Sequence, residues 1–377
     1  MRRSTPLAAL AAIFAVTACQ DGTVVAPATP DAPASAARSA NAPIYLVTFK
    51  DGVDVDAATA DLARGNGFAV RGIRRAAARG FSAVIPAARL EAMRADPRVE
   101  RVEQDGPVQL VFPVQTLARP GGGGTTGQSV PWGITRVGGA GDGTGKTAWI
   151  LDTGIDLSHP DLNTSRNCHT FFAGTSPEDG NGHGTHVAGT VAAKNNTIDV
   201  VGVAANAYVC SVRVLGNSGS GTWEGIVNGV NYVALNGASG DVANMSLGGG
   251  GSNATLEKAV TDLAALGVRV VVAAGNEGVN AGTTTPSRVN APNVYTISAI
   301  DSKDCMPTWS NWGNPPVDFA APGVSITSTR KGGGTTTMSG TSMSAPHVAG
   351  ILLLGSVRAS GSATCDRDGS PDPIASR

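Results

Sequence analysis

An α/β fold with a mainly parallel central sheet, preceded by a small α+β unit, is the fold class that the sequence predicts. From about residue 130 onward, short apolar runs rich in Val and Ile alternate with helical stretches, as in a parallel sheet covered on both faces. Before that, residues 44–102 show the order β-α-β-β-α-β of a ferredoxin-like unit. Glycine supplies 50 of the 377 residues, so we expect many tight turns and close backbone approaches.

The small unit spans residues 44–111 and follows a segment, 20–43, whose Ala, Pro, Thr and Asp content predicts a linker. A glycine run marks a junction at residues 112–128, before a large domain at 129–358. In the small unit, strands are expected at 44–49, 69–73, 81–85 and 99–102, and helices at 57–64 and 89–94. In the large domain, strands are expected at 147–151, 208–215, 242–245, 268–274 and 294–300, and helices at 222–235 and 255–266. The tail, 359–377, is polar and is expected to be loop-like.

Composition excludes several functional classes. The net charge is −1, charged residues make up only 15% of the chain, and no block of five or six like charges occurs. A nucleic-acid-binding arm is therefore excluded. The hydrophobic content of 41% excludes disorder along the whole length. We expect a globular monomer that binds no nucleic acid.

Residues 1–19 are predicted to be an export signal. Two arginines precede an apolar run, Leu7–Val16, which at about ten residues is too short to cross a bilayer. The run ends in Val16-Thr17-Ala18-Cys19, which resembles a bacterial lipobox in which Cys19 would be lipidated. Ordinary cleavage near Ala18 is the alternative. Either way we expect an exported protein, extracellular or in the cell envelope, with a lipid anchor if Cys19 is modified.

Export favours disulfides, and four cysteines remain when Cys19 is set aside. They are Cys168, Cys210, Cys305 and Cys365. Four cysteines allow three pairings, and proximity along the chain favours Cys168–Cys210 and Cys305–Cys365. Four buried free thiols are the alternative.

Three motifs that suggest other chemistry fail on their context. Residues 140–147 nearly match a phosphate-binding loop, but the glycines precede a strand instead of following one. The pair His183 and His186 lacks the spacing and the Glu of a zinc protease. Ser342 lacks the second Gly of an esterase elbow.

Three segments carry a nucleophile, a base and an acid. Asp152 ends the apolar strand at 148–152, where a buried carboxylate needs partners. His183 and Ser342 each stand at the start of a glycine-flanked helix. Taken singly, the three residues have ordinary explanations as a strand-end cap, a turn residue and an N-cap. Their side chains together make up the set used in serine-nucleophile catalysis.

The motifs Asp-Thr-Gly at 152–154, Gly-His-Gly-Thr-His-Val-Ala-Gly at 182–189 and Gly-Thr-Ser-Met-Ser-Ala-Pro-His at 340–347 resemble those of subtilisin-like serine proteases. The resemblance covers about residues 131–357 and is strongest to the proteinase K branch. It implies a three-layer subtilisin-like fold and a serine endopeptidase that works through an acyl-enzyme, without a catalytic cofactor. It assigns Ser342 as nucleophile, His183 as general base and then acid, and Asp152 as the group that orients the imidazole. His186 and His347 are expected to be structural.

The same resemblance implies an oxyanion hole and a substrate site for proteins or peptides. Asn276 would donate to the oxyanion together with the backbone N–H of Ser342; a turn Asn after a buried strand is the alternative. Glu277, its neighbour, would lie at the rim, and residues 212–221 would flank the substrate. Two segments would line the substrate pocket: Ser246, Leu247, Gly248 and Gly249 on one side and Ala273, Ala274 and Gly275 on the other.

Residues 44–111 resemble the family's inhibitory propeptide, so the chain is expected to be a self-processed zymogen cut between Leu110 and Ala118. Pro292, Val294 and Asp318 resemble a calcium site of the proteinase K branch, and calcium takes six to eight oxygens. A solvated Asp at a turn is the alternative. Only 35 residues (377 − 342) follow Ser342, so the family's last helices are expected to be shortened.

Two other classes of function remain open. An inactive protease fold could serve as a surface-anchored binding protein, and an esterase could use the same three residues.

Overall fold

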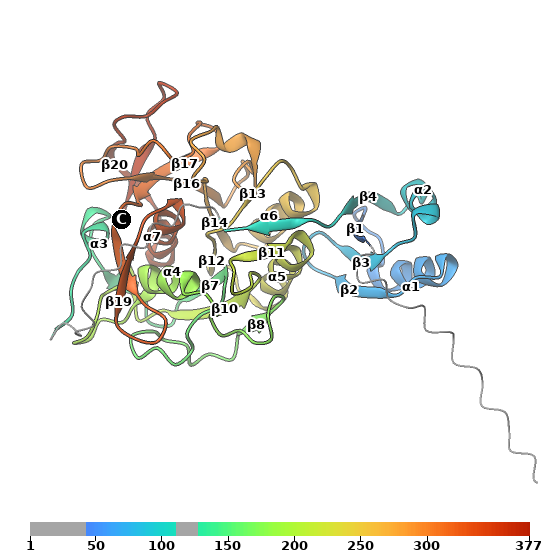
Figure 1. Ribbon diagram of the computed structural model, residues 1–377, viewed down its shortest axis with the longest axis horizontal. Helices are drawn as coiled ribbons and strands as arrows, with labels where there is room; N and C mark the ends of the chain where they lie inside the picture. The colour runs from blue at the N-terminus through green and yellow to red at the C-terminus, as the bar shows by residue number, and fades with distance from the viewer. Residues whose placement is uncertain (1–42, 111–126) are drawn as a thin grey trace, which may run out of the picture. The chain divides into compact units, whose positions relative to one another are not determined.

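The computed structural model of the protein (Figure 1) describes residues 43–110 and 127–377. Its largest sheet has nine strands, in the order β20-β21-β17-β16-β14-β12-β7-β10-β8. Neighbouring strands are parallel throughout, except for the antiparallel pair β20–β21. The nine strands are β7 (Thr147–Asp152), β8 (Thr170–Phe171), β10 (Tyr208–Arg213), β12 (Val242–Met245), β14 (Arg269–Ala273), β16 (Val294–Ile300), β17 (Val317–Pro322), β20 (Arg358–Ser362) and β21 (Pro373–Ser376).

Helices cover both faces of this sheet. Helices α4 (His183–Ala192) and α7 (Thr341–Leu354) share a core with alternate residues of β7, Ala148 and Ile150. Helices α5 (Trp223–Asn236) and α6 (Ala254–Ala265) share a second core with the residues between, Trp149 and Leu151. Because both faces are buried, these strands appear in the sequence as continuous apolar runs. The three-layer α/β fold is confirmed.

The small unit at residues 44–104 is a four-stranded antiparallel sheet in the order β2-β3-β1-β4. Its two helices bury apolar side chains such as Leu62 and Met93 against Phe49 and Phe81 of the sheet. This is the ferredoxin-like arrangement that the sequence predicts. The elements are β1 (Ile44–Phe49), α1 (Val55–Asn66), β2 (Val70–Arg74), β3 (Gly80–Val84), α2 (Ala87–Ala95) and β4 (Val99–Gln104).

The remaining elements are short, and the strands among them pair two by two. They form the two-stranded sheets β11–β5, β13–β15, β18–β19 and β6–β9. Their bounds are β5 (Pro107–Gln109), α3 (Trp132–Arg136), β6 (Gly141–Asp142), β9 (Ala204–Ala205), β11 (Ser220–Thr222), β13 (Gly249–Gly250), the 3-10 helix η1 (Ala281–Thr283), β15 (Thr284–Thr285), β18 (Ile326–Thr329) and β19 (Thr335–Met338).

The tail at residues 359–377 is not loop-like, and that expectation is wrong. Strand β21 joins the central sheet parallel to β17, with Ile374 opposite Ala320, and Ile374 and Ala375 are buried. Strand β20 pairs with β21. A run of four residues with one large apolar side chain is too short to stand out as a strand in the sequence. Residues 355–377 contain no helix.

Both expected disulfides are present. Cys168 pairs with Cys210 and Cys305 with Cys365, with Cα–Cα distances of 5.4 and 5.2 Å. The second bond tethers the segment before β21 to the loop after β16.

Several expected segments lie outside the described residues. These are the export signal at 1–19 with Cys19, nearly all of the linker at 20–43 and most of the junction at 112–128. Within the described ranges, no helix has the length and apolar character needed to cross a membrane.

Candidate active site

Asp152 and His183 form a buried pair at the carboxyl end of the central sheet. Asp152 is the last residue of β7, and His183 is the first residue of α4. The Nδ1 atom of His183 lies 2.8 Å from Oδ1 and 3.0 Å from Oδ2 of Asp152. The backbone N–H of Thr153 also donates to Oδ1 of Asp152, at 2.7 Å. These contacts satisfy a carboxylate that is fully buried and hold the imidazole with Nε2 pointing away from it.

The glycine after the histidine allows this close approach. A Cβ at Gly184 would lie 2.1 Å from the carbonyl oxygen of Gly154 and 3.1 Å from Cβ of Asp152. Any side chain at position 184 would therefore push α4 away from the end of β7. The motif His-Gly-Thr-His thus has a packing requirement at its second position.

The pKa of His183 is set by opposing effects. Burial by itself lowers this pKa, but the charge and hydrogen bond of Asp152, together with the charge of Asp179, outweigh burial and raise it above the ordinary value. A raised pKa strengthens the imidazole as a base.

Ser342 is the second residue of α7 and is fully buried. Pro346 lies inside the same helix and has no N–H, so the carbonyl of Ser342 receives no helical hydrogen bond from position 346. The hydroxyl of Ser246 donates to that carbonyl instead, at 2.9 Å. In return, the hydroxyl of Ser342 donates to the carbonyl of Ser246, at 3.2 Å. The chain after β12 and the start of α7 are thereby joined side by side.

The structure does not join Ser342 to His183 by a hydrogen bond. The Ser342 hydroxyl is directed at Ser246, and Nε2 of His183 is buried without a hydrogen-bond partner among the described residues. A serine hydroxyl changes direction by rotation about χ1 alone. Such contacts are often open before substrate binds.

Asn276 follows the end of β14 and is held against the start of α7. Its Oδ1 accepts from the backbone N–H of Thr341 at 2.9 Å and from the Thr341 hydroxyl at 3.0 Å. These bonds fix the amide so that Nδ2 is its donor end. A Cβ at Gly340 would lie 3.2 Å from Nδ2, so the glycine before Thr341 keeps this donor uncrowded.

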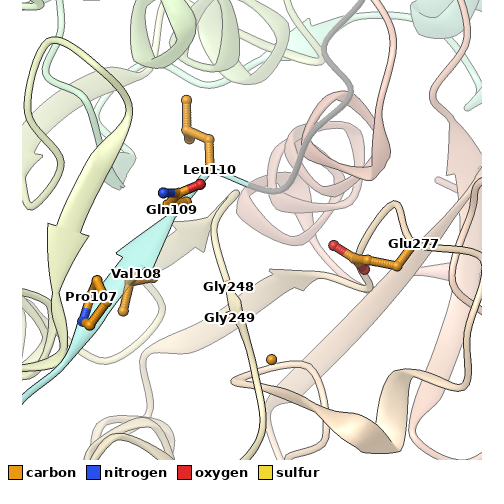
Figure 2. Close-up of a pocket in the computed structure, with 8 residues that line it drawn as sticks. Pro107, Val108, Gln109, Leu110, Gly248, Gly249 and Glu277 are labelled. Carbon is orange, nitrogen blue, oxygen red and sulfur yellow. The ribbon is translucent and has the colours of Figure 1, made fainter.

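Strand β5, which follows the small unit along the chain, lies beside the expected substrate-binding segments (Figure 2). Strand β5 pairs antiparallel with β11, and Gln109 bridges to Gly248. The backbone N–H of Leu110 donates to the carbonyl of Gly219 at 2.8 Å. Residues 107–110, 248–250 and Glu277 together line a cleft of about 400 Å³.

The comparison with known proteins decides the family. The sequence model of the subtilase family matches residues 143–359, more than half of the chain. The chain belongs to the subtilase family. Alkaline serine protease ver112 from Corniculantispora psalliotae is 40% identical over 306 residues, which cover 76% of this chain and 75% of that protein. Subtilisin Savinase from Lederbergia lenta is 44% identical over 234 residues, which cover 60% of this chain and 84% of that protein.

A solved structure supports the same family assignment. The crystal structure of a cold adapted subtilisin-like serine proteinase has a TM-score of 0.57 and 36% identity, and the match covers 64% of this chain and 96% of that one. The predicted resemblance and fold class are therefore confirmed, and this subtilase is a serine endopeptidase.

Two other histidines of this subtilase belong to the packing of the fold. Burial lowers the pKa of His186 to about 3 and that of His347 to about 4, so both are neutral at ordinary pH. His186 Nε2 lies 2.9 Å from the carbonyl of Ile326, and His347 Nδ1 lies 2.8 Å from that of Met343.

Asp318 fits a cation by its surroundings. Burial raises the pKa of this carboxyl to about 6, and its Oδ2 accepts one backbone N–H, from Thr296 at 2.8 Å. A desolvated carboxylate with one donor gains from a bound cation. Val294 is buried nearby in the paired strand, whereas Pro292 is exposed. Within residues 43–110 and 127–377, no three His, Cys, Asp or Glu side chains form a metal-binding group, so carbonyl oxygens and water would supply the other ligands.

A second oxygen-rich place was not predicted from the sequence. Asn196 Nδ2 donates to Oδ1 of Asp161 at 2.7 Å, and Gln128 Nε2 lies 2.6 Å from the carbonyl oxygen of Lys194. Burial raises the pKa of Asp161 to about 6. Turning over the amide of Asn196 would present its oxygen to the Asp161 carboxylate. These residues are scattered from 128 to 196, so no local motif marks them.

Proposed function

We propose that this subtilase cleaves peptide bonds through Asp152, His183 and Ser342 by way of an acyl-enzyme. The buried Asp152–His183 pair, at 2.8 Å, is the observation that carries the proposal. The pair leaves Nε2 of His183 available to accept a proton. The chain belongs to a family of serine proteases. The site needs no catalytic cofactor.

In the proposed reaction, substrate binding turns the Ser342 hydroxyl from the Ser246 carbonyl to Nε2 of His183. His183 takes the hydroxyl proton as Oγ attacks the scissile carbonyl, and Asp152 stabilises the imidazolium. Nδ2 of Asn276 and the backbone N–H of Ser342 donate to the oxyanion. His183 then returns the proton to the leaving amine, and water releases the acyl group by the same steps.

The proposal is tested by casein hydrolysis and by labelling with a fluorophosphonate, which reacts with an activated serine. We expect casein cleavage and a label on the peptide that carries Ser342. Cleavage of esters but not of casein would favour an esterase. Absence of both label and hydrolysis would favour a non-catalytic binding protein.

We propose further that residues 44–111 are an inhibitory propeptide. Two of its carboxylates contact the N-termini of helices in the large domain. Glu103 accepts from the backbone N–H groups of Ala254 and Thr255, at 3.0 and 2.7 Å, and Asp105 accepts from that of Glu224 at 2.8 Å. Carboxylates at such positions are favourable because helix N-termini carry unpaired N–H groups and partial positive charge.

The position of β5 supports self-inhibition. With β5 paired to β11 and Gln109 bridged to Gly248, an added peptide strand would be blocked from the same edge. The chain runs on from Leu110 toward the proposed cut, between Leu110 and Ala118. In this proposal residues 1–19 direct export, 20–43 link, 112–128 hold the cut, 129–358 form the peptidase, and 359–377 complete its sheet. The protein would be released outside the cell or held at the envelope through Cys19.

We propose that calcium stabilises the fold at one of two sites. The first is Asp318 with the carbonyls of Pro292 and Val294, and the second is the oxygen-rich cluster around Asp161. Calcium would supply positive charge to a buried carboxylate and would take no part in the reaction.

With enzyme first inactivated by fluorophosphonate, so that autolysis is absent, we expect excess chelator to lower the melting temperature by about 5–10 °C. Asp318→Asn and Asp161→Asn separate the two places: the variant at the occupied place loses the response to chelator, and the other keeps it. Equal melting curves with and without chelator would rule out both.

A further inference from the structure

We propose that Asp179 is a positioning residue for His183: it holds the first turn of α4 against the end of β7 and places a negative charge beside the imidazole. The proposal rests on the proposed role of His183 as the base. Asp179 itself touches neither Ser342 nor the cleft, so it acts through His183.

The Asp179 carboxylate collects five hydrogen bonds although it is only 3% exposed. Oδ1 accepts from the backbone N–H groups of Asn181 and Gly182, at 2.9 and 2.8 Å, and from the Thr153 hydroxyl at 2.9 Å. Oδ2 accepts from the backbone N–H and the hydroxyl of Thr185, at 2.9 and 2.6 Å. Donors from the residue after Asp152, from the turn before α4 and from the first turn of α4 thus converge on one side chain.

This side chain replaces the N-cap that α4 lacks. The N-cap position is Gly182, which has no side chain to accept a hydrogen bond and adopts a φ of 113°, a value that favours glycine. The N–H of Thr185, which a cap side chain ordinarily satisfies, is bonded to Asp179 instead. The start of α4, and with it His183, therefore depends on a residue outside the helix.

The same carboxylate reaches the other catalytic segment. The Thr153 hydroxyl donates to Asp179 and accepts from the backbone N–H of Gly184, at 3.1 Å. Thr153 directly follows Asp152, and Gly184 directly follows His183. One carboxylate and one hydroxyl thus fix the two residues next to the pair, which sets the 2.8 Å contact between them.

Charge supplies the second part of the role. A helix N-terminus carries about half a positive charge, which disfavours protonation of a histidine at the first helical position. Asp179 lies on the N–H groups that carry that charge, and its own charge raises the pKa of His183. His183 becomes an imidazolium during the reaction, so a negative charge that opposes the positive helix N-terminus favours the transition state.

Other charged groups around His183 come from several elements. Asp152 comes from β7 and His186 from α4 itself. Lys331, after β18, lies near Gly182, and the Arg213 guanidinium of β10 lies near Gly180. Burial keeps His186 neutral. Asp179 and Asp152 are the two carboxylates whose charges raise its pKa.

Asp179→Asn tests the proposal, because the amide keeps the shape but loses the charge and one acceptor atom. The measurements are kcat, KM and the acid limb of kcat/KM on a peptide nitroanilide, normalised by fluorophosphonate titration of active sites. We expect kcat to fall about 10–100-fold, as misplaced catalytic groups do, with KM unchanged. The acid limb should move to lower pH by about 0.5–1 unit, because a lost negative charge lowers the pKa of His183.

Asp156→Asn is the matched control. Asp156 is also a buried residue just after β7, but its carboxylate accepts from Ser158 and Gly332. Its contact with α4 is the backbone N–H bond to the Thr185 hydroxyl, which Asn keeps. We expect the acid limb of kcat/KM in Asp156→Asn to lie at the same pH as in the parent enzyme. An unmoved acid limb in Asp179→Asn, or an equal shift in both variants, would overturn the electrostatic role.

Thr153→Val keeps the charge of Asp179 and removes only the hydroxyl that joins Asp179 to the N–H of Gly184. It is the second test variant if Asp179→Asn fails to fold. We expect a several-fold lower kcat with KM and acid limb unchanged; an unchanged kcat would overturn the positioning role. Failure of the proposed function is distinguishable, because the parent enzyme would then take up no fluorophosphonate at Ser342.

Discussion

Replacing Ser342 by Ala should lower kcat by about a million-fold, the scale known for loss of the nucleophile in subtilisin itself. The alanine has no Oγ to form the acyl-enzyme, while the buried Asp152–His183 pair stays intact. Because the proposed self-cleavage would use the same serine, the variant should also accumulate as the uncut precursor. Casein hydrolysis and N-terminal sequencing of the purified protein measure the two effects.

Ser344→Ala is the matched control for this experiment. Ser344 lies two residues further along α7 and is equally buried, and its hydroxyl has no hydrogen-bond partner among the described residues. We expect this variant to keep its activity and to begin between Leu110 and Ala118 after processing. A Ser342→Ala chain that is still cut at that place would contradict self-processing and point to another protease.

Asn276→Ala should lower kcat by about 10²–10³-fold and leave KM nearly unchanged, again on the scale measured in subtilisin. The amide donor acts on charge that develops only in the transition state, so its loss spares substrate binding. Thermal melting checks that the fold survives the loss of the two bonds from Thr341 to Oδ1. Unchanged turnover would remove Asn276 from the mechanism.

Much of the fold was predictable because its signals are local. Strands β12 and β16 begin and end at the expected residues, since buried parallel strands leave continuous apolar runs between turn residues. Strands β5 and β21 were not predicted. Each has three or four residues with no clear alternation, and each is held by a partner far away in the chain, which no sequence window contains.

The candidate site divides in the same way. The sequence motifs named Asp152, His183, Asn276 and Ser342 as candidate site residues. The structure brings Asp152 to His183 and Asn276 to the start of α7. The direction of the Ser342 hydroxyl was not predictable, because a rotamer depends on neighbours such as Ser246. The role that we propose for Asp179 was not predicted, although this residue opens the glycine-rich segment before His183. Its spacing, six residues before Thr185, gains meaning only when the turn at Gly182 folds it back.

The contacts of Glu103 and Asp105 with the helix starts have a consequence for the enzyme after processing. In the proposed processing, a peptidase domain cut free of residues 44–110 would lose the two carboxylates at the N-termini of α6 and α5. The side-chain caps Asn253 and Thr222 would remain at those helix starts. The cut domain would then refold without contacts that the precursor has, so the height of its unfolding barrier would govern its working lifetime more than the equilibrium between folded and unfolded chains.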